Sequence, residues 1–440
     1  MPVLETEFNR QIHQHTQPQG KIVLALSGGL DSRVLLELLA RFKRDNPNCD
    51  VKAVYVHHGL SANADQWENN CKEWCAQSQV PFSCERVSLD TQSSESLEEL
   101  ARDARYQVLE KHINDGDVLL TGQHLSDQSE TFLLALKRGS GPKGLASMAQ
   151  SASFGHGTLL RPLFNVPRHS IERFALDNKL EWNHDESNDD TQFDRNFLRH
   201  KVIPQLTERW SGFEKAVQRS ATLCAEQQLL LEELLESKLN EATMKDAGIS
   251  IPYLAEQSHL ARAQLIRMWL ERQNAKMPSR KQLQLIWDEV ACSQRDANPN
   301  LKLSSGDVRR HDDKLYLVSP QRDLSDWSHI LEVNQSLILP DGLGHLTLKN
   351  TNLNPQGLLL RAPLQSEKVT VHFCPQGLSA KPVGRNGSRK LKKLFQEYGV
   401  PSWKRRQMPI VMYNDHIAAV ADLFVTQRFC APDCELIWVH

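Results

Sequence analysis

A run of six residues near the N-terminus has the chemistry of a phosphate-binding loop: Ser27, Gly28, Gly29, Leu30, Asp31 and Ser32. Two adjacent glycines let a backbone turn tightly and approach a ligand. The N–H groups at the start of a following helix, together with the positive end of its dipole, attract an anion. A simple capped turn uses the same residue types, because Asp and Ser are good helix caps. A strand before the loop and a helix after it favour pyrophosphate or triphosphate binding.

The loop differs from those of kinases and GTPases. The sequence has no GxxxxGK(S/T) motif, and therefore no lysine placed to hold the β and γ phosphates. This absence argues against transfer of a γ-phosphoryl group.

The elements around the loop alternate between strands and helices. Short apolar runs predict strands at 21–26, 51–56, 81–87 and 117–121, and apolar periodicity predicts helices at 32–43, 64–79, 96–113 and 128–137. Such alternation indicates βαβ units and a parallel sheet, a Rossmann-like nucleotide-binding domain of the α/β class. Ligands of these sheets bind at the carboxyl ends of the strands, where the loop lies.

The alternation ends near residue 204. Amphipathic patterns predict helices at 211–241, 260–274 and 280–291, and short strands follow, for example at 314–318, 346–349, 409–413 and 417–421. We therefore predict three domains: residues 1–210 with the parallel sheet, residues 211–320 mainly helical, and residues 321–440 of small α+β type.

The overall composition narrows the class of protein. The chain has 440 residues, with 52 Lys and Arg against 54 Asp and Glu, a formal net charge of −2. Its mean hydropathy is −0.49, and no run approaches the roughly 18 apolar residues that a membrane helix needs. The polar N-terminus shows no secretory signal, and nine cysteines without a CxxC pair fit a reducing cytoplasm and give no zinc or iron–sulfur site.

The six-residue loop resembles the SGGxDS signature of the N-type ATP pyrophosphatases, the PP-loop superfamily, which cleave ATP between the α and β phosphates to adenylate a carbonyl oxygen. Further motifs choose among its members: His57-His58, ARDARY at 101–106, TGQHLSDQSET at 121–131, RGSG at 138–141, DESN at 185–188 and RNFLR at 195–199. In this order they resemble the tRNA(Ile)-lysidine synthetases. Ser126 stands where that family usually has a second Asp, and Gln123 replaces a commoner small residue.

The resemblance implies an ATP-dependent ligase that forms a carbon–nitrogen bond. ATP would adenylate the carbonyl of the wobble cytidine in a tRNA(Ile) with a CAU anticodon. The ε-amine of free L-lysine would then displace AMP, and the lysidine formed would change codon reading from AUG to AUA. Mg²⁺ would accompany ATP and neutralise its phosphates. Because the lysine ammonium has a pKa of about 10.4, only about one molecule in 2,500 has a neutral amine at pH 7, so the site must supply a base or desolvation.

The same resemblance assigns roles to single residues. Asp31 is the candidate for metal or base duty. The strand-end position of His57 suits framing of the adenine of ATP and acid–base work equally. Asp127 and Glu130, three apart at a helix start, would hold the ammonium groups of lysine, although helix capping alone explains that spacing. Arg195 would complete the catalytic set with Asp31 and Asp127 by contacting the α phosphate.

Two further arginines of this region, Arg105 and Arg199, are candidates for tRNA contact. Arg195 and Arg199 share one helical face, and surface ion pairs with Asp189 or Asp190 are the alternative for both.

Positive charge is concentrated between residues 381 and 406. Nine basic residues stand against one acidic residue, Glu397, which gives a local charge of nine minus one, or +8. Six of the basic residues are our candidates for tRNA contact: Arg385, Arg389, Lys390, Lys392, Lys393 and Arg405. Phe395, Tyr398 and Trp403 interleave with them, a combination typical of nucleic-acid binding, and the stretch resembles the C-terminal tRNA-contacting domain of larger lysidine synthetases. A solvated basic face is the alternative.

Other functions stay open at this level. A tRNA 2-thiolation enzyme shares the adenylation step but needs a nucleophilic or cluster-binding cysteine set, which we do not find. An ATP-dependent small-molecule amidating synthetase has no use for the basic C-terminal segment. A non-enzymatic RNA-binding protein leaves the loop at 27–32 unexplained. The sequence does not determine the oligomeric state, and a homodimer stays open.

Replacing Lys390 and Lys393 together by alanine should weaken tRNA binding and flatten its salt dependence. For every phosphate that is no longer neutralised, the slope of log affinity against log salt should become shallower by about 0.7–0.9, because fewer counterions are released. Fluorescence anisotropy with labelled tRNA at several salt concentrations measures this slope. An unchanged slope would support the alternative, in which the segment is a solvated basic face.

Overall fold

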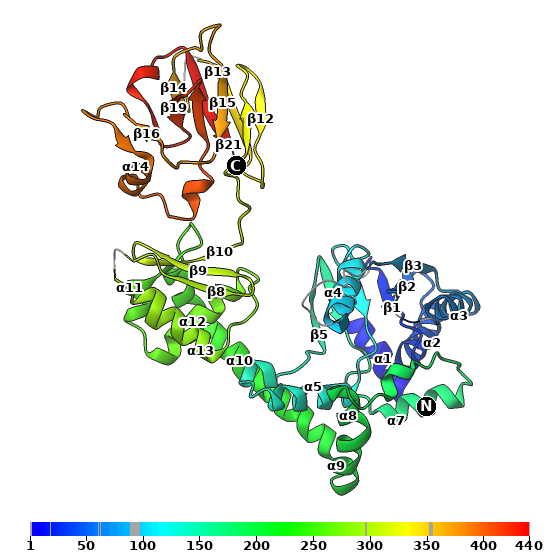
Figure 1. Ribbon diagram of the computed structural model, residues 1–440. Helices are drawn as coiled ribbons and strands as arrows, with labels where there is room; N and C mark the ends of the chain where they lie inside the picture. Colours follow the sequence, from blue (N-terminus) through cyan, green and yellow to red (C-terminus); the bar gives the residue numbers. More distant parts are fainter. Residues whose placement is uncertain are drawn as a thin grey trace. The chain divides into compact units, whose positions relative to one another are not determined.

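The computed structural model in Figure 1 describes residues 2–439 except 18, 60, 62, 89–96, 295–296 and 352–354. It divides into two compact units, Met1–Leu231 and Glu232–His440. Helix α10 (Phe213–Ala242) belongs to both. The finer division at residues 210 and 320 stays a prediction.

The first unit contains a six-stranded sheet and the helices that cover it. The strands are β1 (Ile22–Ala25), β2 (Val51–His57), β3 (Phe82–Arg86), β4 (Val118–Leu120), β5 (Ser151–Phe154) and β6 (Gly157–Leu160). The helices are α1 (Pro2–His15), α2 (Leu30–Asp45), α3 (Ala64–Gln77), α4 (Leu97–Glu110), α5 (Leu125–Lys137), α6 (Pro142–Leu145), α7 (Arg168–Asp177), η1 (Glu186–Asp189), α8 (Asp194–Phe197), η2 (Leu198–Val202) and α9 (Ile203–Arg209).

The strand order β3-β2-β1-β4-β6-β5 confirms the predicted α/β class. All neighbouring pairs are parallel except β5 with β6. Ile22 of β1 pairs in register with Val51 on one side and Val118 on the other. Both faces of β1 are buried, since Leu24 and Val23 pack into different apolar clusters. Such two-sided burial explains the continuous apolar run that predicted the strand.

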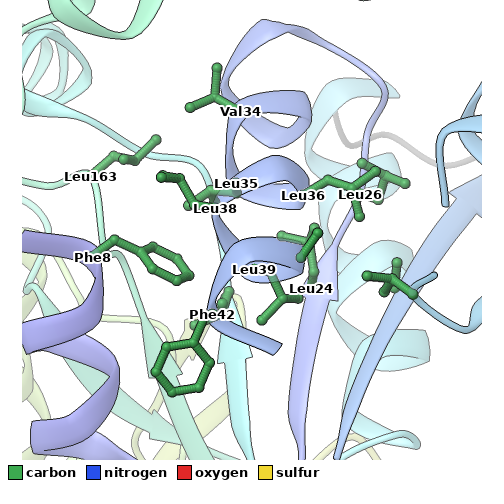
Figure 2. Packing of buried hydrophobic residues seen from close by; sticks show 14 of the residues in the cluster. Phe8, Leu24, Leu26, Val34, Leu35, Leu36, Leu38, Leu39, Phe42 and Leu163 are labelled. Carbon is green, nitrogen blue, oxygen red and sulfur yellow. The ribbon is translucent and has the colours of Figure 1, made fainter. Parts of the chain in front are cut away.

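One face of this sheet is covered by α1, α2, α3 and α7, which contribute to a single apolar cluster. Figure 2 shows Leu35 and Leu39 of α2 among its members, with Phe8 of α1 close by. The rings of Phe8 and Phe42 lie 6.4 Å apart at 75°, an edge-to-face contact. This packing fixes α2, and therefore the loop at its start, against the sheet.

The order in which successive strands are added reverses between the parallel neighbours β1 and β4, since β2 and β3 lie on one side of β1 and β4 begins the other side. The carboxyl ends of β1 and β4 carry the loops that lead into α2 and α5, the place where ligands of such sheets bind. Gly122 allows these loops to approach each other, because a Cβ there would lie 3.1 Å from Cβ of Asp31.

The element boundaries agree with the sequence prediction at most places in the first unit. Helix α5 begins at Leu125, three residues before the predicted start, so Asp127 lies in its first turn. Helices α1 and α7 and strands β5 and β6 were not predicted. The predicted start of the helix at 96–113 lies outside the described residues.

The second unit contains helices and several antiparallel sheets. Its helices are α11 (Ile251–Ala255), α12 (His259–Glu271), α13 (Arg280–Leu285), η3 (Ile286–Ala291), α14 (Leu391–Glu397), η4 (Lys404–Arg406) and η5 (Gln427–Phe429). Its strands are β7 (Ile249–Ser250), β8 (Asn300–Leu303), β9 (Gly306–His311), β10 (Lys314–Val318), β11 (Ser328–Ile330), β12 (Ser336–Ile338), β13 (His345–Asn350), β14 (Leu358–Leu360), β15 (Val369–His372), β16 (Ser379–Ala380), β17 (Arg389–Lys390), β18 (Ile410–Tyr413), β19 (His416–Val420), β20 (Phe424–Val425) and β21 (Cys434–Val439).

The region expected to be mainly helical also contains the antiparallel sheet β7-β10-β9-β8. Trp269 of α12 is buried there and donates from Nε1 to the carbonyl of Ala247 at 2.8 Å. Further along the chain, sheets β11-β15-β18-β19-β20 and β12-β13-β21-β14 share one apolar cluster. No helix among the described residues is long and apolar enough to span a membrane.

The aromatic residues of the basic segment are not all available to stack on bases. Phe395 and Trp403 are buried, and Phe395 lies in the core under α14. Of the three, only Tyr398 is exposed. Phe395 and Trp403 therefore interleave with the cations in the sequence but not at the surface, because apolar burial outweighs their sequence neighbourhood.

Replacing Leu35 by alanine should lower the free energy of unfolding of the first unit by about 2–5 kcal/mol, because it leaves a cavity in the cluster of Figure 2. Urea unfolding measures the change. Leu176→Ala is the matched control, since Leu176 is 67% exposed on α7. Equal effects of both changes would contradict this description of the core.

Candidate active site

The phosphate loop is held closed by the hydroxyl of Ser32. Its Oγ accepts hydrogen bonds from the backbone N–H of Ser27 at 3.2 Å and of Gly28 at 3.1 Å, and donates to the carbonyl of Gly29 at 3.0 Å. Gly28 has φ +82°, in the left-handed region that favours glycine. Ser32 therefore shapes the loop rather than simply adding a donor for a ligand.

A residue far along the chain supports the loop from behind. The backbone N–H of Asn183 donates to the carbonyl of Gly28 at 2.9 Å. A Cβ on Gly28 would lie 2.5 Å from Nδ2 of Asn183 and 2.9 Å from Sγ of Cys71. Gly28 is therefore required by space as well as by its backbone angle. The sequence pattern did not reveal Asn183, since it stands just before the DESN motif with no signal of its own.

The loop opens onto the first turn of α2, where the N–H groups of residues 30–32 have no partner within the helix. Asp31 lies in this turn, and its Oδ1 is buried without a hydrogen-bond partner. Burial raises the pKa of the Asp31 carboxyl above its usual value, and the opposing charge of His124 offsets only part of the rise. A buried carboxylate oxygen that accepts no hydrogen bond and lies beside a phosphate loop fits a Mg²⁺ ligand.

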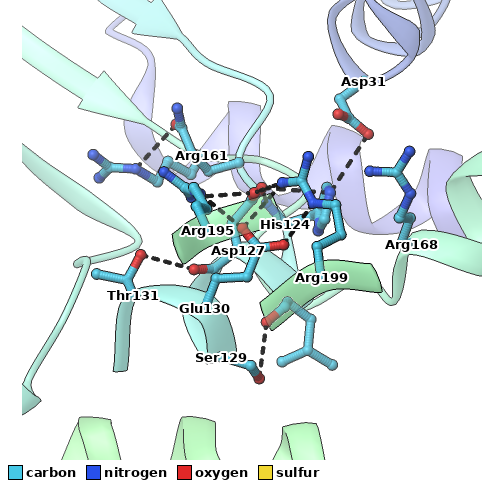
Figure 3. Close-up of polar contacts among 12 residues, drawn as sticks. Asp31, His124, Asp127, Ser129, Glu130, Thr131, Arg161, Arg168, Arg195 and Arg199 are labelled. Carbon is cyan, nitrogen blue, oxygen red and sulfur yellow. Dashed lines mark hydrogen bonds and ion pairs between the residues drawn. The ribbon is translucent and has the colours of Figure 1, made fainter. Parts of the chain in front are cut away.

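A carboxylate–arginine cluster lies next to the loop, as Figure 3 shows. The carboxylate of Glu130 is fully buried. Its Oε2 accepts from Nε of Arg195 at 2.7 Å, and its Oε1 accepts from Nε of Arg199 at 2.7 Å. The same guanidinium groups reach Oδ1 of Asp127, at 3.3 Å for Arg195 and 3.1 Å for Arg199. Two acids and two bases therefore neutralise one another in a largely enclosed site.

Asp127 is held in its ionised form. Its Oδ2 accepts from the backbone N–H of His124 at 3.0 Å. Burial alone would raise the pKa of Asp127, but the charges of His124, Arg195 and Arg199 and this hydrogen bond together lower it. The pKa values of Asp31 and Asp127 thus move in opposite directions.

His124 connects the two carboxylates. The residue is fully buried, and its Nε2 lies 3.7 Å from Oδ1 of Asp31 and 3.4 Å from Oδ2 of Asp127. The neighbouring Gln123, the unusual residue of this motif, accepts at Oε1 from Nε of Arg161 at 3.2 Å. Arg161 also donates to the carbonyl of Ala149 at 2.6 Å, which ties the loop after β4 to the strand region behind it.

The structure brings the three candidate catalytic residues, Asp31, Asp127 and Arg195, into one cluster. The same cluster contains Glu130, predicted to bind lysine, and Arg199, predicted to contact tRNA. It excludes the surface-pair alternative for the arginines, since both pair with Asp127 and Glu130. His57 instead contacts Oδ1 of Asp65 through Nε2 at 3.1 Å. Arg105 is exposed and donates from Nε to Nε2 of His58 at 3.2 Å.

His57, Asp65 and Glu68 form a group that could hold a cation. Arg86 already donates to both carboxylates, at 2.9 Å to Asp65 and 2.6 Å to Glu68. This arginine supplies the positive charge that a metal ion would bring.

The tRNA candidates of the basic segment fall into two groups. Arg385 and Arg389 both pair with Glu397, and Arg405 donates to the carbonyl of Val400 at 2.9 Å. Lys390, Lys392 and Lys393 are exposed and form no ion pair with any residue that the structure describes. The lysines are therefore freer to meet a polyanion than the arginines.

Comparisons with known proteins agree along the whole chain. Three family models match: a PP-loop domain over residues 4–206, a TilS substrate binding domain over residues 249–316 and a TilS substrate C-terminal domain over residues 369–440.

The chain is also similar to proteins of known function over its full length. It is 56% identical over 438 residues to tRNA(Ile)-lysidine synthase of Vibrio parahaemolyticus, covering 100% of this chain and 99% of the relative. Identity to the enzyme of Vibrio vulnificus is 52% over 440 residues and 100% of both chains. A solved structure, U34-tRNA thiolase NcsA from Methanococcus maripaludis, aligns with 51% of this chain and 79% of its own at 16% identity and a TM-score of 0.42.

Replacing Arg199 by alanine should lower the free energy of unfolding by about 3 kcal/mol, because it leaves buried carboxylate charge undercompensated. The share that comes from Asp127 has a defined pH dependence. Because its folded pKa is lowered, this share is complete above the usual value of about 3.9 and is lost as pH falls through the lowered value. Urea unfolding between acid and neutral pH measures both.

Arg173→Ala is the control for this change. Arg173 forms an exposed pair with Asp177 at 3.7 Å on α7, and its removal should change stability by less than about 1 kcal/mol. If Arg199→Ala were as mild as this control, the cluster would not be a stabilising unit.

Proposed function

The chain belongs to the tRNA(Ile)-lysidine synthase family, and we propose on that basis that it ligates free lysine to the wobble cytidine of a CAU-anticodon tRNA(Ile), using ATP. The observation that carries the proposal at the level of the site is the meeting of a phosphate loop and a carboxylate–arginine cluster at one edge of the sheet. The first activates a substrate with ATP, and the second suits a substrate with ammonium groups.

In the first step the carbonyl oxygen of the cytidine attacks the α phosphorus of ATP, and pyrophosphate leaves as the bond to the β-phosphate oxygen breaks. The free N–H groups at the start of α2 would bind the phosphates. Asp31 is our candidate to hold the Mg²⁺ that accompanies ATP, because its buried Oδ1 has no hydrogen-bond partner. Mg²⁺, when bound, would neutralise phosphate charge.

In the second step the ε-amine of lysine attacks the activated carbon, AMP leaves as the bond between this carbon and the phosphate oxygen breaks, and the amine passes a proton to a base, the second duty for which Asp31 is a candidate. Asp127 is our candidate to bind an ammonium group, since its lowered pKa keeps it anionic. Its Oδ1 is contacted by both arginines and its Oδ2 by the backbone N–H of His124, so the ammonium group would share these oxygens or replace a guanidinium. Glu130 was predicted to share this duty. Both of its oxygens are occupied by Arg195 and Arg199, so direct contact with lysine requires an ammonium group to replace one guanidinium. With its present contacts, Glu130 positions the arginines that would face the α phosphate.

The thiolation alternative is disfavoured by the cysteines nearest the loop. Burial raises the pKa of Cys71 and of Cys75 to about 12, so both thiols are protonated and poorly nucleophilic at neutral pH. An amidating synthetase of small molecules would leave the exposed lysines at 390–393 without a role. These lysines instead support contact with tRNA. The nine cysteines without a CxxC pair support a reducing cytoplasm as the compartment.

Incubation of the protein with ATP, Mg²⁺, labelled lysine and CAU-anticodon tRNA(Ile) should incorporate label into tRNA and release AMP. Asp31→Asn should abolish both while tRNA binding survives, because Asp31 lies at the phosphate loop rather than in the basic segment. Asp45→Asn, at the exposed far end of α2, is the control and should stay active.

Loss of activity in Asp31→Asn should not come from unfolding. The raised pKa of Asp31 means that its ionised form costs stability above the usual carboxyl pKa, so the neutral amide should leave the ligand-free protein as stable or more stable at pH 7. Wild-type protein that incorporates no lysine would refute the proposed function. Loss of tRNA binding in Asp31→Asn would mean that Asp31 contributes to tRNA binding rather than to the reaction with ATP.

A further inference from the structure

Two phenylalanines lie exposed on the helical segment that carries Arg195 and Arg199. Phe193 is 53% exposed and Phe197 is 47% exposed. The backbone N–H of Phe197 donates to the carbonyl of Phe193 at 2.9 Å, so the two residues are one helical turn apart. Side chains four residues apart share a helix face. Two neighbouring exposed rings form an apolar patch, and contiguous apolar patches often mark interaction sites.

The opposite face of this segment belongs to the active site. Arg195 and Arg199 are also four residues apart, and both point to the buried Glu130, as Figure 3 shows. A helix with its side chains is only about 10–12 Å across. The exposed rings therefore lie within about one helix width of the catalytic carboxylates.

Cationic and open backbone groups lie beside the rings. Asp194, between Phe193 and Arg195, pairs with Nζ of Lys137 at 2.5 Å, which ties the end of α5 to α8. The next residue, Arg138, is exposed, as is Lys201 in η2, and neither forms an ion pair with any described residue. The surface thus combines aromatic rings with uncompensated positive charge.

The RGSG motif, to which the reaction assigns no role, follows directly on Lys137. Gly139 has φ +68°, which explains one glycine. Gly141 does not have a positive φ, and a Cβ on it would meet nothing within 4 Å, so neither backbone angle nor internal packing requires it to be glycine. A glycine that neither the backbone angle nor the packing requires can instead let the backbone of another molecule approach closely.

Resting on the proposed function, we propose that Phe193, Phe197 and the loop at 138–141 form a platform for the unpaired nucleotides that flank the reacting cytidine in the anticodon loop. The rings stack on bases, while Arg138 and the open glycine backbone receive the phosphates. Single-stranded RNA fits this surface better than a protein partner does, because the rings are accompanied by unpaired cations. A base that reacts at the cluster must also leave the anticodon stack, and neighbouring bases need a support.

The test compares Phe193→Ala/Phe197→Ala with wild-type protein in lysidine formation at varied tRNA concentration. The double variant should raise the KM for tRNA by about 5- to 100-fold, with kcat at saturating tRNA changed much less, since stacking contributes about 1–3 kcal/mol per base. Phe193→Tyr/Phe197→Tyr should restore KM because the ring is kept. Leu176→Ala, an apolar truncation in the same unit at a residue that is 67% exposed, should leave KM unchanged.

A second measurement locates the contact on the RNA. The fluorescence of 2-aminopurine placed beside the wobble position should fall on binding to wild-type protein and to the tyrosine variant, but not to the alanine variant. Arg138→Ala should weaken tRNA binding without removing the fluorescence change. An unchanged KM and an unchanged fluorescence response in the alanine variant would overturn the platform. The exposed rings would then be assigned to contact with a protein partner. Absence of lysidine formation by wild-type protein would instead overturn the proposed function itself.

Discussion

The burial of one carboxylate, that of Glu130, is the constraint on which the rest of the site depends. A fully buried negative charge is tolerated only when it is paired and hydrogen-bonded. Arg195 and Arg199 meet this need with one short contact to each oxygen. In doing so they bring the segment from α8 to η2 against α5 and extend to Asp127. A stabilising ion cluster and the organisation of the active site are therefore one interaction.

The cluster reaches the phosphate loop through His124. This buried ring lies between Asp127 and Asp31, and the missing side chain of Gly122 lets the loop after β4 approach the first turn of α2. The neighbouring carboxylates then acquire pKa values that move apart, raised for Asp31 and lowered for Asp127. Acids with separated pKa values can divide the work of one reaction, so that one stays an anion for binding while the other can exchange a proton.

The pairing of cations differs between the active site of the first unit and the basic segment at 381–406. In the active site of the first unit, Arg195 and Arg199 pair with the buried acids Asp127 and Glu130. In the segment at 381–406, Glu397 holds Arg385 and Arg389, while the lysines stay exposed. A net charge of −2 therefore conceals a local surface suited to a polyanion. We attribute this surface to the tRNA contact proposed for the exposed lysines.

The sequence by itself determined what depends on local order. Apolar runs and periodicity located most strands and helices of the first unit, and the phosphate loop could be identified because its function resides in six consecutive residues. Only the tertiary structure decided what depends on distant contacts. Asn183 reaches Gly28 from a remote part of the chain, Arg195 reaches Glu130 across 65 residues, and Phe395 turns inward among cations. A sequence pattern does not predict these contacts. They form because residues distant in the chain are packed into the same buried space, where every charge must be paired.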